Sequence, residues 1–207
     1  MSSITFIGAG NMARTIGALA VAGGNTVEVM ARDQAKADAL AKALGGGATA
    51  GTWRAAPTGD IVITALLYDA VVPAVAQYGD ALASKVIVDI SNPFNATFDG
   101  LAVSEETSIA QEVAKVAPAG ASVVKAFNTI FRNVLEKGRP DVFIAGDDAQ
   151  AKADVAAFIE SLGLRPLDAG ALKMAHWLEG MGLVTVGLAG NGIGHGDFAL
   201  GVNEFTG

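Results

Sequence analysis

Short apolar runs alternate with longer segments of helical periodicity along most of the chain. Runs without polar alternation predict buried strands, and apolar residues that recur every three to four positions predict the helices between them. We expect strands at 4–7, 26–30, 60–66, 86–90, 122–127, 141–145 and 164–168, and helices at 16–22, 33–44, 69–77, 107–116, 148–162 and 171–180. Strands separated by helices indicate βαβ units. The fold class is therefore α/β, a doubly wound (Rossmann-type), mostly parallel sheet in one domain.

The last 28 residues break this pattern. Residues 180–207 contain nine glycines with apolar residues between them and no clear period. We divide the chain into a domain at residues 1–179 and a Gly-rich C-terminal tail at 180–207, which is not a separate domain. A surface tail, a lid and a dimer-swapped arm all remain open for it.

A glycine-rich turn follows the first predicted strand. The segment Gly8-Ala9-Gly10-Asn11-Met12-Ala13 fits the pattern G-x-G-x-x-A. In this pattern the first glycine permits a tight turn, and the second lets the backbone approach a pyrophosphate. The third small residue packs the helix on its strand, and the helix N-terminus supplies N–H donors. A strand before and a helix after favour dinucleotide binding over a merely structural turn.

The end of the second predicted strand distinguishes NAD from NADP. An acid there accepts the ribose hydroxyls, whereas an arginine accommodates a 2′-phosphate. This chain has Arg32 at that point and Lys36 one helical turn later, while Glu28 falls inside the strand. Asp33 reads as the N-cap of the next helix, although beside a 2′-phosphate it would repel. The pattern favours NADP.

Charge, cysteine usage and hydropathy exclude several partners. Fourteen basic residues against 21 acidic ones give a net charge of −7, which argues against nucleic-acid or anionic-membrane binding. The chain has no cysteine, so thiolate nucleophiles and Cys-based metal sites are absent. No apolar run nears the roughly 20 residues needed to cross a bilayer. We expect a cytoplasmic protein that has no membrane partner.

Candidates for acid–base or metal chemistry are sparse. His176 and His195 are nineteen residues apart and form no metal motif, so we expect no metal site. Lys125 and Asn128 have the spacing of a dehydrogenase Lys/Asn pair, but strand geometry would place them on different faces. We therefore name no catalytic residue. Hydride transfer between two bound cofactors needs alignment more than proton transfer, so this scarcity fits it.

Five stretches together resemble the deazaflavin (coenzyme F-420, or F420)-dependent NADP oxidoreductases. The soluble NADPH-binding domain of the six-transmembrane metalloreductases is a related member. The resemblance covers residues 4 to about 178, and its stretches are Ile7 to Ala13, Val88 to Pro93, Val123 to Ile130, Val142 to Asp148 and Gly163 to Gly170.

This resemblance implies a homodimer that transfers a hydride between NADP(H) and a small-molecule redox acceptor. NADPH would lie along the first two strands, and the acceptor would stack beyond it. The implied cofactor-binding residues are Gly8, Ala9, Gly10, Asn11 and Met12 at the pyrophosphate, Arg32 and Lys36 at the 2′-phosphate, Leu66 and Leu67 along the cofactor, Asn92 and Pro93 beside the nicotinamide, and Ala126, Asn128 and Thr129 at the acceptor.

The chain departs from the deazaflavin enzymes at three of these positions. In the glycine turn they carry Gly-Gly-Thr-Gly where this chain has Ile7-Gly8-Ala9-Gly10, so the threonine hydroxyl is missing. The chain also has Asn128 where they have a histidine and Leu67 where they have a proline. Phe127-Asn128-Thr129 is more similar to the metalloreductases, whose acceptor is a flavin, so deazaflavin and FMN or FAD all stay open. Two other functions are the alternatives. One is an imine reductase similar to pyrroline-5-carboxylate reductase, and the other is a non-catalytic NADP-sensing module.

Overall fold

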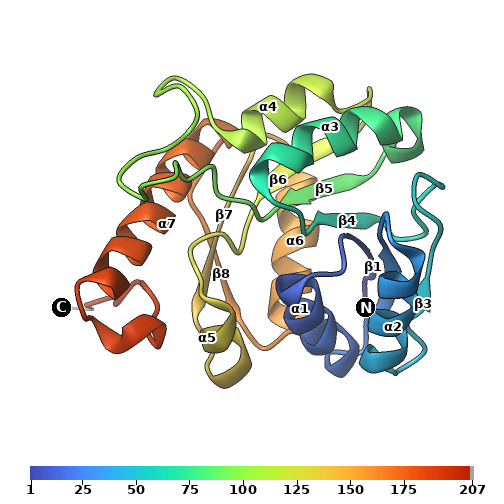
Figure 1. The fold of residues 1–207 in the computed structure, drawn as a ribbon, viewed down its shortest axis with the longest axis horizontal. Coiled ribbons are helices and arrows are strands. Elements are labelled where there is room, and N and C mark those ends of the chain that lie inside the picture. The colour runs from blue at the N-terminus through green and yellow to red at the C-terminus, as the bar shows by residue number, and fades with distance from the viewer. Residues whose placement is uncertain (206–207) are drawn as a thin grey trace.

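An eight-stranded sheet forms the centre of the computed structural model, which describes residues 1–205 (Figure 1). Its strand order is β3-β2-β1-β4-β5-β6-β7-β8, and all neighbours pair in parallel except β6 and β7. The strands are β1 Ser3–Ile7, β2 Thr26–Met30, β3 Thr49–Ala50, β4 Ile61–Thr64, β5 Val86–Asp89, β6 Ser122–Lys125, β7 Asp141–Gly146 and β8 Arg165–Asp168. The predicted α/β fold with a mostly parallel sheet is confirmed.

Helices cover both faces of the sheet. They are α1 Asn11–Ala22, α2 Gln34–Leu44, α3 Tyr68–Tyr78, α4 Ile109–Val116, α5 Arg132–Lys137, α6 Ala149–Ser161 and α7 Ala175–Gly190, with 3-10 turns η1 Gly79–Leu82, η2 Leu172–Met174 and η3 Gly194–Gly196. Residues of α1, α2 and α6 build the apolar core on one face, around Phe6 and Phe158. Residues of α3, α4 and the start of α7 build the other, around Val62 and Ile87. Figure 1 shows α3 and α4 together on their side of the sheet.

The predicted strands are all present, but some end earlier than expected. Residues 65–66, 90 and 126–127 follow the last paired residue of β4, β5 and β6. They were included because they are apolar. After the chain leaves the sheet, residues 90 and 126–127 stay buried and residues 65–66 stay partly buried. Strand β3 and helix α5 were missed because two and six residues are too short to show a period.

Helix α7 corrects the prediction for the C-terminal end. A helix ending at residue 180 and a tail from there were expected, but the helix runs from Ala175 to Gly190. The boundary at 179/180 therefore falls inside a helix. One of its glycines has a packing role: a Cβ on Gly182 would lie 2.9 Å from Asn92 Oδ1 and 3.2 Å from the carbonyl oxygen of Asn128. Glycine lets α7 approach the loops after β5 and β6.

The segment after α7 is attached to the edge of the sheet. Arg165 on β8 donates to both carboxylate oxygens of Asp141 on β7, each at 2.6 Å. The same two side chains bind the backbone of Val202, through its N–H at 2.8 Å and its carbonyl oxygen at 2.6 Å. The guanidinium holds the pKa of Asp141 below its usual value. Within residues 1–205, no helix is long and apolar enough to cross a membrane.

Candidate functional site

A cleft of about 850 Å³ opens at the carboxyl ends of β1, β2 and β4. One side consists of the turn after β1 and the residues after β2, and the other consists of the residues after β4 and the start of α3. In an open parallel sheet, ligands bind at this edge, where the connections diverge to opposite faces. The cleft therefore lies where the glycine motif predicted a dinucleotide.

Gly8 forms the floor of this cleft in a conformation that needs glycine. Its φ is +119°, and an added Cβ would lie 2.3 Å from the carbonyl oxygen of Ala65. Its N–H donates to the carbonyl oxygen of Met30 at 2.8 Å. The turn after β1 is thus wedged between the ends of β2 and β4, which only a residue without a side chain permits.

Gly10 differs from Gly8, because its missing side chain faces open space. Apart from the two adjacent residues, no atom of the described chain lies within 4 Å of an ideal Cβ at this position. Gly10 is also the N-cap residue of α1, and no side chain caps that helix end. The first N–H groups of α1 are therefore free to donate to an anion, as at the pyrophosphate sites of dinucleotide-binding folds.

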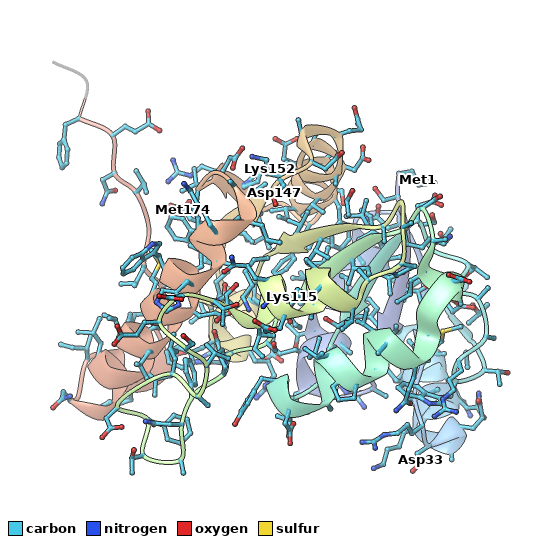
Figure 2. All side chains as sticks on the ribbon, turned by 90° about the horizontal axis from the view of Figure 1, so that it is seen from above. Met1, Asp33, Lys115, Asp147, Lys152 and Met174 are labelled. Atoms are coloured by element: carbon cyan, nitrogen blue, oxygen red, sulfur yellow. The ribbon has the colours of Figure 1, made fainter. Side chains whose placement is uncertain are left out.

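Two basic side chains lie at one end of the cleft. Arg32 and Lys36 both line it, together with Asp33. Asp33 caps α2 as expected and accepts from the N–H of Lys36 at 3.4 Å. Figure 2 shows Asp33 at the outer end of the molecule, where α2 begins. Its carboxylate also lies 3.9 Å from the Lys36 ammonium, so this acid is partly neutralised and the end of the cleft carries net positive charge.

Glu28 is unavailable to a ribose. This side chain is buried, and it accepts from Thr5 Oγ1 at 2.8 Å and from the N–H of Thr58 at 2.9 Å. The interpretation that Glu28 lies too early in β2 to meet a cofactor therefore agrees with its position. Trp53 is a lining residue that the sequence analysis missed, and its ring packs edge-on against Tyr78 at 5.3 Å.

The structure places the other predicted residues in two groups. Ala9, Leu66 and Leu67 line the cleft, and Asn11 and Met12 begin α1 beside it. The second group lies outside the cleft lining, beyond β5 and β6: Asn92, Pro93, Ala126, Asn128 and Thr129. The side chains of Ala126, Asn128 and Thr129 are almost entirely buried. The roles of these residues toward cofactor and acceptor stay predictions.

Asn92 and Asn128 contact each other directly. The Asn92 amide donates to the carbonyl oxygen of Asn128 at 2.7 Å, and the Asn128 amide donates to Asn92 Oδ1 at 2.9 Å. Asn128 also donates to the carbonyl oxygen of Leu178 on α7 at 2.8 Å. Its own Oδ1 is buried and has no hydrogen-bond partner within residues 1–205. The pair fixes the loops after β5 and β6 against α7.

A fully buried ionic cluster was missed by the sequence analysis. The Lys125 ammonium donates to Asp89 Oδ2 at 2.7 Å, to Glu179 Oε1 at 2.8 Å and to the carbonyl oxygen of Ser91 at 2.6 Å. Burial raises the pKa of Glu179, and Lys125 partly offsets that effect. The available signal was Lys125 at the end of one apolar strand and Asp89 at the end of its neighbour.

The two histidines lie away from the cleft. His176 Nδ1 is 2.7 Å from the carbonyl oxygen of Thr107, which ties α7 to the loop before α4. His195 is in the turn η3 and is exposed. Neither belongs to the lining of the cleft. The described residues also contain no group of three or more His, Cys, Asp or Glu side chains that could hold a metal ion.

Comparison with known proteins agrees with this geometry. Residues 3–93 match the family model described as NADP oxidoreductase, coenzyme F420-dependent. The F420-dependent NADP reductase of Methanocaldococcus jannaschii is 31% identical over 144 residues, which cover 65% of this chain and 64% of that protein. Over these residues the chain is similar to the coenzyme F420-dependent NADP oxidoreductases. The resemblance stated from the sequence is confirmed.

Two further relatives extend the likeness beyond residue 93. Metalloreductase STEAP3 of Rattus norvegicus is 30% identical over 184 residues, which cover 87% of this chain but 36% of that protein. The solved structure of a candidate F420-dependent NADP reductase from Arthrobacter sp. FB24 has a TM-score of 0.86 at 25% identity, and covers 99% of this chain and 100% of that one. The chain thus spans 36% and 64% of the two curated relatives and the whole of this solved neighbour.

The family match has a clear position in the structure. Residues 3–93 contain the glycine turn, Arg32, Lys36 and the residues after β4, and they end just after β5. The whole 850 Å³ cleft is therefore built from the part of the chain that matches the F420-dependent family. A pyrroline-5-carboxylate reductase from Coxiella burnetii shares the fold, with a TM-score of 0.60 at 19% identity.

Proposed function

We propose that this protein is an NADP-dependent oxidoreductase that moves a hydride between NADP(H) and a deazaflavin (coenzyme F420) or flavin acceptor. One observation carries the proposal: a single cleft joins the open space at Gly10, the uncapped N-terminus of α1 and the Arg32–Lys36 pair. These are the groups that a pyrophosphate and a 2′-phosphate require. The family model that matches the residues lining this cleft is that of coenzyme F420-dependent NADP oxidoreductases.

The residues of the cleft bind and orient rather than transfer protons. The turn after β1 and the start of α1 hold the pyrophosphate, and Arg32 with Lys36 holds the 2′-phosphate. Leu66 and Leu67 supply an apolar wall that excludes water along the dinucleotide. When bound, the nicotinamide supplies the hydride itself, so the protein contributes alignment and electrostatics.

A panel of acceptors tests this function. The protein is mixed with NADPH and, separately, with deazaflavin, FMN, FAD or pyrroline-5-carboxylate, and nicotinamide absorbance is followed. We expect oxidation of NADPH with deazaflavin or a flavin. Oxidation with pyrroline-5-carboxylate alone would make the protein an imine reductase. Tight NADPH binding without oxidation by any of the four would favour a sensing module instead.

Arg32→Ala should weaken NADPH binding by about ten- to a hundredfold and change NADH binding by less than about twofold. The reason is that a hydrogen bond to a charged group contributes about 1.5–3 kcal/mol, and only NADPH carries the 2′-phosphate. Isothermal titration calorimetry with both nucleotides measures the effect. Lys42→Ala, in the last turn of α2 and outside the cleft lining, is the matched control. Equal losses for the two nucleotides would contradict the role of Arg32.

We also propose that the protein forms a homodimer through α7. Trp177, Met181 and Val184 lie on one face of this helix, and the side chains of Trp177 and Val184 are 67% and 57% exposed. Together with Phe143 and Leu167, Trp177 and Met181 border an apolar groove of about 460 Å³. Contiguous exposed apolar surface of this kind marks interaction sites, and two-fold pairing buries it on both copies at once.

Val184→Glu should therefore shift the protein to a monomer without unfolding it. A charge at the centre of an apolar interface is costly when two copies meet, but it is solvated in the separate chain. Light scattering after size-exclusion chromatography measures the mass at a fixed concentration. Asp154→Lys, on the exposed side of α6, is a control that should leave the mass unchanged. A monomeric wild type would overturn this proposal.

A further inference from the structure

The buried cluster of Asp89, Lys125 and Glu179 has an excess of negative charge. All three side chains have no exposed surface. Each N–H of the Lys125 ammonium is used, two for the carboxylates and one for the carbonyl oxygen of Ser91. With both carboxylates ionised, the two negative charges and one positive charge leave a net charge of −1. Such a charge is only weakly screened because water and salt do not reach it.

This cluster lies next to the predicted nicotinamide end of the site. Asp89 ends β5, and Ser91, which binds Lys125, directly precedes Asn92. Glu179 follows Leu178, whose carbonyl oxygen accepts from Asn128. The residues that follow β4 line the cleft. In the sheet, β5 lies beside β4, and β6 lies beside β5. Because neighbouring strands are about 4.8 Å apart, the cluster lies within about 10 Å of that wall in the direction across the sheet.

We infer that this buried cluster makes the site favour the oxidised nicotinamide over the reduced one. The inference rests on the proposed function, since it requires NADP(H) in the cleft. The two forms of the dinucleotide have the same phosphates and riboses and differ at the nicotinamide, which is cationic when oxidised and neutral when reduced. A fixed negative charge nearby therefore stabilises only the oxidised form.

The direction of this effect suits a hydride donor. In the transfer, the C4–H bond of the reduced ring breaks, and the hydrogen leaves with both electrons for the acceptor. The ring is left with one positive charge, and the acceptor gains the hydride. A negative cluster beside the ring stabilises this product, so the protein makes bound NADPH a stronger donor than free NADPH. Glu179 is a positioning residue in this account, because it acts through the field and does not touch the ring.

Glu179→Gln is the variant that removes the excess charge with the least change of shape. A glutamine oxygen can still accept from Lys125 and from the N–H of Ile109, which binds Glu179 at 3.1 Å. Dissociation constants of NADP⁺ and NADPH are measured at pH 8 for both proteins. We expect the preference for NADP⁺ over NADPH to fall by about three- to tenfold in the variant. Glu160→Gln, an exposed acid on α6, should leave the preference unchanged.

The outcomes separate this inference from the proposed function. If wild type binds neither nucleotide, the proposed function fails. The second outcome is that wild type binds both nucleotides, and Glu179→Gln keeps the wild-type preference for NADP⁺ over NADPH within twofold or increases it. The inference is then overturned, and the proposed function stands. A general loss of packing would weaken both nucleotides together and leave their ratio unchanged.

A pH series on wild type gives the same test if the variant does not fold. As pH falls through the raised pKa of Glu179, its carboxyl takes up a proton, the cluster becomes neutral, and the preference for NADP⁺ should shrink. The charged groups facing Glu179 are Asp89 from β5 and Lys125 from β6, and α4 contributes the N–H of Ile109. Elsewhere, Glu112 and Lys115 of α4 pair with each other, and His176 binds Thr107. A preference for NADP⁺ that grows as the pH falls would overturn the inference.

Discussion

Lys125→Met should lower the free energy of unfolding by about 3–5 kcal/mol. The substitution removes the one ammonium that both buried carboxylates contact and leaves Asp89 and Glu179 uncompensated. Breaking a buried ion pair on one side has this cost because the remaining charge is neither paired nor hydrated. Urea unfolding followed by circular dichroism measures the change.

Lys152→Met is the matched control for that experiment. Lys152 also pairs with an aspartate, Asp168, at 2.8 Å, but the Asp168 side chain is half exposed. Such surface pairs contribute about 0–1 kcal/mol, so a loss of less than about 1 kcal/mol is expected. An equally small loss for Lys125→Met would show that the cluster does not hold β5, β6 and α7 together.

Substitutions of Gly8 and Gly10 should separate stability from cofactor binding. Gly8→Ala forces a side chain into a φ of +119° and against the carbonyl oxygen of Ala65, so we expect a loss of about 2–4 kcal/mol in unfolding free energy. Gly10→Ala meets no atom within 4 Å, and its stability should stay within about 0.5 kcal/mol of wild type.

The affinity for NADPH should be sensitive to the Gly10 substitution even though the stability is not. The methyl group of Gly10→Ala occupies the space through which a pyrophosphate reaches the start of α1, so NADPH affinity should fall at least about tenfold. Thermal unfolding with and without NADPH measures both quantities in one experiment. A Gly10→Ala protein that binds NADPH like wild type would contradict the placement of the pyrophosphate.

Local signals predicted most of the residues that line the cleft. The strand, the glycine turn and the helix after it are contiguous in sequence, so their geometry follows from neighbouring residues. Arg32 and Asp33 were interpretable in the same way, because the end of a strand and an N-cap are defined by a few adjacent positions. This is why the lining of the cleft contains most of the residues that the sequence assigned to the pyrophosphate and the 2′-phosphate.

Contacts between distant residues could not be predicted in this way. The cluster joins Lys125 to partners 36 and 54 positions away in the sequence. Strand periodicity predicted that Lys125 and Asn128 lie on different faces, but it could not predict which residues either side chain would contact. Gly182 looked like part of a tail because glycine is rare inside helices, whereas it permits α7 to pack on Asn92. Both features depend on how the elements pack, which no single segment encodes.

The proposed function requires a hydride to pass directly from bound NADPH to the acceptor. The most direct test uses NADPH that carries deuterium at C4, on each face in turn, with deazaflavin as acceptor and mass spectrometry of the product. Carbon-bound deuterium does not exchange with water, so we expect one label in the reduced deazaflavin from one of the two NADPH isomers. Reduced deazaflavin without label from either isomer, or no reduction at all with deazaflavin and with flavins, would contradict it.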